Sequence, residues 1–201
     1  EIENYYLVFK EVKILMTNVI IVHSQLGNSH NHWYKWLQHN LELEGYDVQL
    51  FHLDESKNDN IDNWIFELNQ QIELLSKDTY FVTHGYGSLA TLKYIEGLSI
   101  YEPFEGFFSI AGFKEDAKKI DDSIKVGEFN VDYDLIKTKV NDFYGLASKD
   151  DSYVSYIETQ NLIDELGGKT KIVDEGGHFL EEEGFVSFTE LQEKMQHYMT
   201  K

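Results

Sequence analysis

A histidine and an aspartate stand in two turns whose composition suits proton transfer. His178 follows a glycine pair in the turn 174–179, and Asp151 closes the acidic turn 148–151. An imidazole can take a proton from a nucleophile, and a carboxylate can fix the imidazole tautomer and stabilise its cation. We therefore expect a carboxylate of this acidic turn to pair with His178 as acid and base, in preference to His178 being a loop histidine without a role.

A third turn, Thr-His-Gly-Tyr-Gly at residues 83–87, lies between an apolar run at 79–82 and a helix-like segment at 88–95. A strand-to-helix turn of the pattern Gly-x-Ser-x-Gly presents the nucleophile of α/β hydrolases. Here Gly85 occupies the place of the serine. Glycine adopts the positive φ of such a turn at little cost. Because losing a triad nucleophile lowers turnover roughly 10⁶-fold, the usual acyl-enzyme route is expected to be closed.

Other groups could replace the missing hydroxyl. Ser88 lies one helical turn further on and is the alternative nucleophile, although we expect its hydroxyl to pack under the sheet or to bond a helix carbonyl. Tyr86 is more readily a wall of the pocket than a nucleophile. The Asp151–His178 pair could also act slowly on water. Finally, Gly85 could stand where a parent chain carries serine.

Metal sites are considered and set aside. Asp150 and Asp151 are adjacent, so their carboxylates diverge, and a turn acid with a solvated neighbour explains them better than a cation site. His30 and His32, with His23 nearby, have no evident further ligand for zinc. We expect no metal and no cofactor.

The composition narrows the partners. The 36 acidic and 17 basic residues of the 201-residue chain give a net charge of −19, and every basic residue is lysine. Nucleic acid and anionic membranes are therefore poor partners, and no arginine is present to clamp a phosphate. The chain has no cysteine, which excludes disulfides and a thiol nucleophile. No run has the length of a membrane span, and the first residues lack a basic signal-peptide start. A cytoplasmic protein is expected.

Short apolar runs alternate with segments of helical period, which indicates a parallel sheet covered by helices on both faces. The expected strands lie at 18–23, 47–53, 79–84, 105–111, 140–147 and 170–174. We predict a doubly wound α/β-hydrolase core of six parallel strands in the order 2-1-3-4-5-6. Residues 16–201 form one domain, in which 113–138 is a small lid or insert and the glutamates 181–183 begin the last helix. Residues 1–15 are either an edge strand or an extension of leader or tag origin, and we favour the extension.

In this order and spacing the motifs resemble the small single-domain serine hydrolases of the retinoblastoma-binding protein 9 and YdeN type. The resemblance starts near Thr17 and is carried by 22–23, 33–37, His84 and Gly87, 148–151, 177–179 and 181–185. It implies that Asp151 is the triad acid, that His178 is the triad base, and that the nucleophile falls on Gly85. It also implies an oxyanion hole made of the backbone N–H groups of Tyr86 and Gln25. The chain departs from the family a second time at Ser24, where glycine is usual.

Three functions are compatible with these patterns. The first is a serine-hydrolase relative for small esters or amides that keeps pocket, acid and base but is impaired or inactive. The second is a working hydrolase that uses Ser88 or a restored serine. The third is a non-catalytic protein that binds a small acyl or ester ligand, or another protein, through the vestigial site. The oligomeric state is not readable from the sequence.

Overall fold

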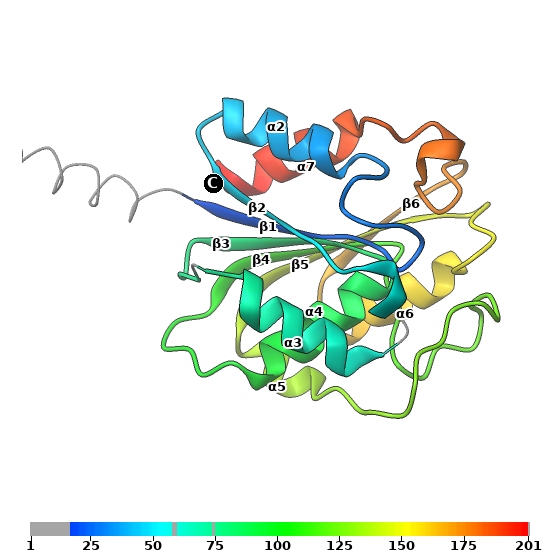
Figure 1. The fold of residues 1–201 in the computed structure, drawn as a ribbon, viewed down its shortest axis with the longest axis horizontal. Helices are drawn as coiled ribbons and strands as arrows, with labels where there is room; N and C mark the ends of the chain where they lie inside the picture. Colours follow the sequence, from blue (N-terminus) through cyan, green and yellow to red (C-terminus); the bar gives the residue numbers. More distant parts are fainter. Residues whose placement is uncertain (1–16, 58–59, 74, 201) are drawn as a thin grey trace, which may run out of the picture.

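The computed structural model describes residues 17–57, 60–73 and 75–200, which form a sheet with helices on both faces (Figure 1). The predicted extension at 1–15 lies outside the described residues. The strands are β1 Asn18–Val22, β2 Asp47–Phe51, β3 Thr79–His84, β4 Phe104–Ile110, β5 Val140–Ser148 and β6 Lys169–Val173. The helices are α2 Tyr34–Leu43, α3 Ile61–Gln71, α4 Tyr86–Gly97, α5 Tyr133–Lys137, α6 Tyr156–Glu165 and α7 Thr189–Met199, with 3₁₀ turns η1 Glu55–Lys57 and η2 Glu181–Glu183.

The sheet has the predicted order, β2-β1-β3-β4-β5-β6, and the described strand pairs are parallel. Each strand begins and ends within two residues of its predicted range. β1 and β3 are buried along their whole length, as expected for central strands that are covered on both faces. The apolar runs therefore predicted both the fold class and the connectivity.

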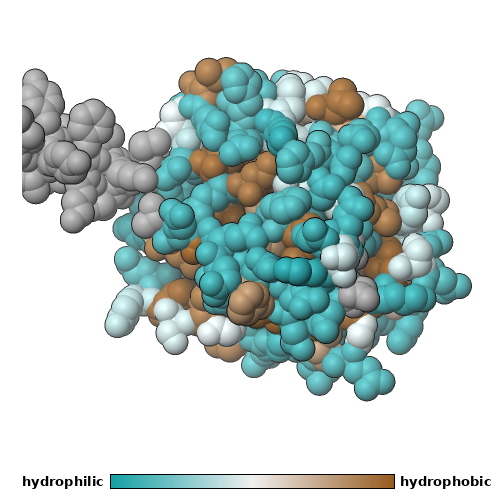
Figure 2. All heavy atoms as spheres, in the orientation of Figure 1, coloured by the Kyte–Doolittle hydropathy of each residue, from teal (hydrophilic) through white to brown (hydrophobic). Residues whose placement is uncertain are grey.

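Two hydrophobic clusters fill the layers on either side of the sheet. Helices α2 and α7 cover one face through Leu37, Leu41, Leu191 and Met195. Helices α3, α4, α5 and α6 cover the other face, and the larger cluster there includes the fully buried Trp64. The outer surface is different: the face drawn in Figure 2 is mostly hydrophilic, with its apolar residues in separate patches. This agrees with the strongly acidic composition.

The last helix begins later than predicted. Residues 181–183 form the separate turn η2, because Gly184 follows with a left-handed φ of 98° and ends it. α7 starts only at Thr189. The glutamates of η2 do not cap a long helix but bind neighbouring loops: Glu181 accepts hydrogen bonds from the backbone N–H of His32 at 2.8 Å and from the Asn31 side chain at 3.3 Å.

The segment 113–138 connects β4 to β5 and is largely irregular, with only α5 and an isolated bridge between Ile120 and Val154. Ile124, Val131 and Ile136 bury their side chains in the cluster that also holds α4. The segment is thus packed against the domain core. Its backbone also reaches the turn 83–87, which we call the elbow: the Tyr86 hydroxyl donates to the Val126 carbonyl at 3.3 Å.

The second glycine of the elbow is required by close packing of α4 on β1. A Cβ on Gly87 would lie 2.2 Å from the His23 carbonyl oxygen, which is backbone and cannot rotate away. We expect Gly87→Ala to lower the free energy of unfolding by about 1–3 kcal/mol or more. The matched control is Gly97→Ala at the other end of the same helix, where a Cβ meets nothing within 4 Å. Urea denaturation of both variants checks this, and equal stabilities would contradict it.

Candidate active site

The predicted site residues follow four strands that end at one edge of the sheet. Because the strands are parallel, the loops after β1, β3, β5 and β6 converge at their carboxyl ends. These loops carry Ser24 and Gln25, Gly85 and Tyr86, Asp151, and His178 respectively. Residues that are far apart along the chain therefore lie in one cluster.

Asp151 and His178 form the expected pair. The His178 Nδ1 lies 2.8 Å from one Asp151 carboxylate oxygen, and both side chains are buried. The other carboxylate oxygen accepts the backbone N–H groups of Tyr153 at 2.8 Å and Val154 at 2.9 Å. A carboxylate held in this way accepts the proton of Nδ1, which leaves Nε2 as the acceptor nitrogen. The pair is thus oriented as a general base would need.

Gly85 has the backbone of a sharp elbow, with φ 54° and ψ −124°. A Cβ at this residue would lie 2.9 Å from Ser24 Oγ, 3.0 Å from Gln25 Oε1 and 3.1 Å from His178 Nε2. His178 Nε2 is buried and has no hydrogen-bond partner among the described residues. The free acceptor of the acid–base pair therefore faces the position at which a nucleophile side chain would begin.

One of the two predicted oxyanion donors, the Tyr86 N–H, is already bonded within the site. The backbone N–H of Tyr86 donates to the side-chain oxygen of Gln25 at 2.8 Å. Gln25 thus brings a carbonyl oxygen to the point at which a hole for a developing oxyanion is expected. A ligand oxygen that uses the Tyr86 N–H must displace this amide.

Ser88 lies in a closed group of buried hydroxyls. Its Oγ lies 2.8 Å from the Thr83 hydroxyl, which donates to the Phe108 carbonyl, and receives a hydrogen bond from Ser109 at 2.9 Å; the side chains of Thr83, Ser88 and Ser109 are fully buried. These contacts hold Ser88 between β3 and β4, in the packing position that the sequence favoured for it. Within residues 17–57, 60–73 and 75–200, no group of three potential metal ligands converges.

A buried relay joins the loop at Ser24 to the loop at His178. The Ser24 N–H donates to the Tyr34 hydroxyl at 3.0 Å, and this hydroxyl lies 2.7 Å from His84 Nδ1. His84 Nε2 lies 2.7 Å from the His178 carbonyl oxygen, which can only accept, so Nε2 carries the proton. The His84 ring also stacks on His178 at 4.9 Å. Burial, together with the neighbouring His178, holds the pKa of His84 well below its usual value, so the relay stays neutral.

Asp150 has a structural role that the sequence did not reveal. One of its carboxylate oxygens accepts the N–H groups of Gly176 at 2.9 Å and Gly177 at 2.8 Å, and the Ser148 hydroxyl. Its pKa is lowered chiefly by the hydrogen bond from Ser148 and next by that from Gly177. Asp150 thereby fixes the glycine pair that presents His178. Adjacent aspartates were the only signal, and they suggested a solvated neighbour.

A second buried histidine makes the fold sensitive to acid. His23 Nδ1 lies 2.7 Å from the Ser24 carbonyl, and its Nε2 accepts the Leu53 N–H at 2.9 Å, so no site for a second ring proton remains. Burial lowers the pKa of His23 from 6.5 to about 4. Between those values the unfolded chain binds a proton that the folded chain does not, so stability present above pH 6.5 is lost as the pH falls toward 4.

We expect His23 to contribute about 3 kcal/mol to this loss over the whole window, and His84 to act in the same direction. Urea denaturation between pH 7 and pH 5 measures the slope. The slope should become shallower in His23→Asn and remain unchanged in His39→Gln, which alters an exposed histidine. Equal slopes in all three proteins would contradict the assignment.

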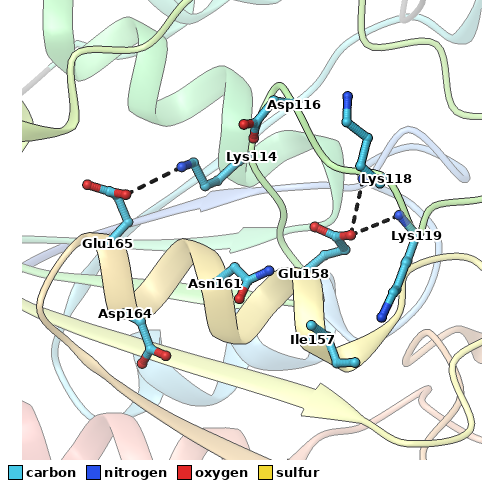
Figure 3. Close-up of a pocket in the computed structure, with 9 residues that line it drawn as sticks. All are labelled: Lys114, Asp116, Lys118, Lys119, Ile157, Glu158, Asn161, Asp164 and Glu165. Atoms are coloured by element: carbon cyan, nitrogen blue, oxygen red, sulfur yellow. Dashed lines mark hydrogen bonds and ion pairs between the residues drawn. The ribbon is translucent and has the colours of Figure 1, made fainter.

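A surface groove of about 740 Å³ lies elsewhere, between residues 114–119 and α6 (Figure 3). Charges of both signs line it, and some are already satisfied: Lys114 pairs with Glu165 at 3.4 Å. Glu158 accepts the backbone N–H groups of Lys118 and Lys119, as the dashed lines show. None of the residues around Gly85 lines this groove. The bonds of Glu158 and Glu165 instead anchor the loop 114–119 to α6.

The parallel sheet, the elbow and the Asp–His pair define a protein of the α/β-hydrolase class. The chain belongs to the serine hydrolase family, whose model matches residues 19–197. It is similar to YdeN of Bacillus subtilis, with 28% identity over 185 residues that cover 91% of this chain and 96% of YdeN. The crystal structure of the B. subtilis ydeN gene product superposes with a TM-score of 0.85 at 26% identity, over 92% of this chain and all of that one.

A more distant structure shares the fold alone. Alpha/beta hydrolase domain-containing protein 10 from mouse matches with a TM-score of 0.66 at 11% identity, over 91% of this chain and 89% of that one. In the part of the chain that the structure describes, none of the helices combines the length and the apolar character that a bilayer span requires.

Proposed function

We propose that this chain is a serine-hydrolase relative whose site receives a small ester or amide, and that its hydrolytic turnover is strongly reduced because position 85 has no hydroxyl. The observation that carries the proposal is the pairing of Asp151 with His178, with Nε2 unbonded and 3.1 Å from the Cβ position of Gly85. This arrangement of acid, base and elbow supports acyl transfer, whereas position 85 has no attacking oxygen and the Tyr86 N–H is bonded to Gln25.

The burial of the site favours a small, uncharged substrate. Tyr86 and His178 are at most 1% exposed, and Gln25 fills the space above the Tyr86 N–H. The contact of the segment 113–138 with Tyr86 through Val126 supports a role for this segment as a wall or lid of the site. A net charge of −19 disfavours anionic ligands on approach.

A second candidate is a protein that binds such a ligand without converting it. The contact between Gln25 Oε1 and the Tyr86 N–H supports this reading, since the donor expected to stabilise an oxyanion already has a partner. In this case the acid–base pair would contribute hydrogen bonds to the ligand and no catalysis.

Hydrolysis of p-nitrophenyl butyrate by the wild type and by the double variant Ser24→Gly/Gly85→Ser separates the two candidates. Strong hydrolysis that appears with the serine at 85, and that is lost on His178→Ala, supports the hydrolase site. A folded double variant that neither hydrolyses the ester nor reacts with a fluorophosphonate would exclude the proposal and favour the binding protein.

A further inference from the structure

Ser24 places a hydroxyl beside the position at which a side chain of residue 85 would begin. Its Oγ is 2.9 Å from the Cβ position of Gly85, and His178 Nε2 is 3.1 Å from the same point. Ser24 is fully buried, as is His178. The chain therefore carries a hydroxyl and an unbonded imidazole nitrogen on two sides of one small space.

The neighbouring hydroxyls are engaged in other contacts. Ser88 is bonded to Thr83 and Ser109, and the Tyr86 hydroxyl donates to the Val126 carbonyl. Of the three atoms closest to the Gly85 Cβ position, Ser24 Oγ is the hydroxyl; the others are an amide oxygen and the imidazole nitrogen itself. Ser24 Oγ is therefore the hydroxyl that is placed to act with His178 Nε2.

We propose that Ser24, on the loop after β1, is the nucleophile of this site and takes the role that a serine at residue 85, after β3, would have. The inference rests on the proposed function, because it assigns the attacking atom of that same site. Ser24 Oγ forms a bond to the carbonyl carbon of the ester, the π electrons move to the carbonyl oxygen, and the hydroxyl proton passes to His178 Nε2.

The remaining steps balance with water alone. The carbonyl re-forms, the bond to the alcohol oxygen breaks, and the alcohol leaves with the proton from Nε2. Water then attacks the acyl-Ser24 carbonyl and gives one proton to Nε2. When the carboxylic acid departs, that proton returns to Ser24 Oγ. Asp151 orients the imidazole throughout by its bond to Nδ1.

Gln25 links ligand entry to release of the Ser24 hydroxyl. Ser24 Oγ donates to Gln25 Oε1 at 3.1 Å and accepts the Leu26 N–H at 3.1 Å. The same Gln25 oxygen accepts the Tyr86 N–H at 2.8 Å. A substrate carbonyl that takes the Tyr86 N–H must move this oxygen away, and Ser24 then loses the acceptor of its proton. Rotation of its side chain toward His178 Nε2 restores a hydrogen bond.

The route is expected to be slow, because Ser24 is not held on the elbow. A displacement of about 1 Å from the optimal attack geometry can lower a rate about 10²-fold. Covalent labelling is a more sensitive readout than turnover, since it accumulates with time.

The test is labelling by a fluorophosphonate probe, with the modified residue located by peptide mass spectrometry. We expect the wild type to be labelled on Ser24, and labelling to fall at least about tenfold in Ser24→Ala. It should persist in Ser29→Ala, which removes another buried hydroxyl of the same loop, bonded to His52. Labelling of another residue, or no difference between Ser24→Ala and the wild type, would overturn the assignment.

A thiol at position 24 gives a second measurement that does not require turnover. The chain has no cysteine, so Ser24→Cys creates a single thiol. A histidine next to a thiol promotes the reactive thiolate. Alkylation of Ser24→Cys by iodoacetamide at pH 7 should slow about tenfold when His178→Ala is added, whereas the same addition to Ser29→Cys should change the rate less than about twofold. Equal effects at both positions would count against the pairing.

The two proposals fail in different ways. If the wild type remains unlabelled while Ser24→Gly/Gly85→Ser is labelled at position 85, the hydrolase site stands and Ser24 is not its nucleophile. If neither protein is labelled and neither hydrolyses p-nitrophenyl butyrate, both proposals are wrong.

Discussion

The double variant Ser24→Gly/Gly85→Ser is expected to hydrolyse p-nitrophenyl butyrate with a kcat/KM at least about 10³-fold above that of the wild type. Removing the nucleophile from an intact triad costs roughly 10⁶-fold in kcat, and the proposed Ser24 route recovers only part of that loss. The acid, the base and the elbow conformation are already present, so the variant has to supply one correctly placed oxygen. Steady-state kinetics on the purified proteins measures the gain.

Both substitutions are needed for full activity, because a serine side chain at 85 would lie too close to the side chains of Ser24 and Gln25. Its Cβ would lie 2.9 Å from Ser24 Oγ and 3.0 Å from Gln25 Oε1. These are the ends of side chains, so they can rotate, but Ser24 would then give up its bonds to Gln25 and Leu26. We expect Gly85→Ser alone to be about 10- to 100-fold less active than the double variant, since its oxygen would be displaced.

The single variant Ser24→Gly is the matched control. It opens the same space without adding a hydroxyl, so it should hydrolyse the ester no faster than the wild type. The positive φ of 54° at residue 85 should also make the two variants with serine at 85, Gly85→Ser and the double variant, about 1–3 kcal/mol less stable than the wild type, which denaturation measures. Equal activities of Gly85→Ser and the double variant would show that Ser24 does not obstruct the elbow.

The fold could be predicted from the sequence because buried strands appear in it as continuous apolar runs. β1 and β3 are buried from end to end, and such strands appear as continuous apolar runs whatever loops follow them. The turns after β5 and β6 could then be assigned to one edge of the sheet, which brought Asp151 and His178 together before any distance was known. Turn composition and chain order were enough for His178 and for an acid in the turn 148–151, whereas the choice of Asp151 came from the resemblance to the family.

Side-chain arrangement within the site was not predictable in this way. Whether Gln25 points its amide into the site depends on a bond to the Tyr86 N–H, and no spacing rule encodes that contact. Tyr34 is fully buried, and nothing in the segment 33–37 indicates that its hydroxyl joins Ser24 to His84. The glutamates of η2 satisfied the rule for a helix start, but Gly184 ended their turn before a helix could form. At these positions, contacts with residues far away in the sequence decide the conformation, and local propensity does not predict it.

In the background of the double variant, Asp151→Asn is expected to lower kcat about 10⁴-fold, the cost known for the same change in a serine-protease triad. The asparagine oxygen can still accept the N–H groups of Tyr153 and Val154, so the fold should be kept. Its amide N–H₂ would then face His178 Nδ1 and donate to it. The imidazole must in response carry its proton on Nε2, where it can no longer accept one from the nucleophile.

Asp150→Asn is the control for this change, because it removes the neighbouring charge while its side-chain oxygen can still accept from Gly176 and Gly177. Its kcat should stay within about tenfold of the background, since it acts on the loop and not on the imidazole tautomer. The tautomer itself can be read from the ¹⁵N chemical shifts of His178, which should exchange the protonated and unprotonated nitrogens in Asp151→Asn only. Unchanged shifts, or equal losses of kcat in the two variants, would remove Asp151 from its role as the orienting acid.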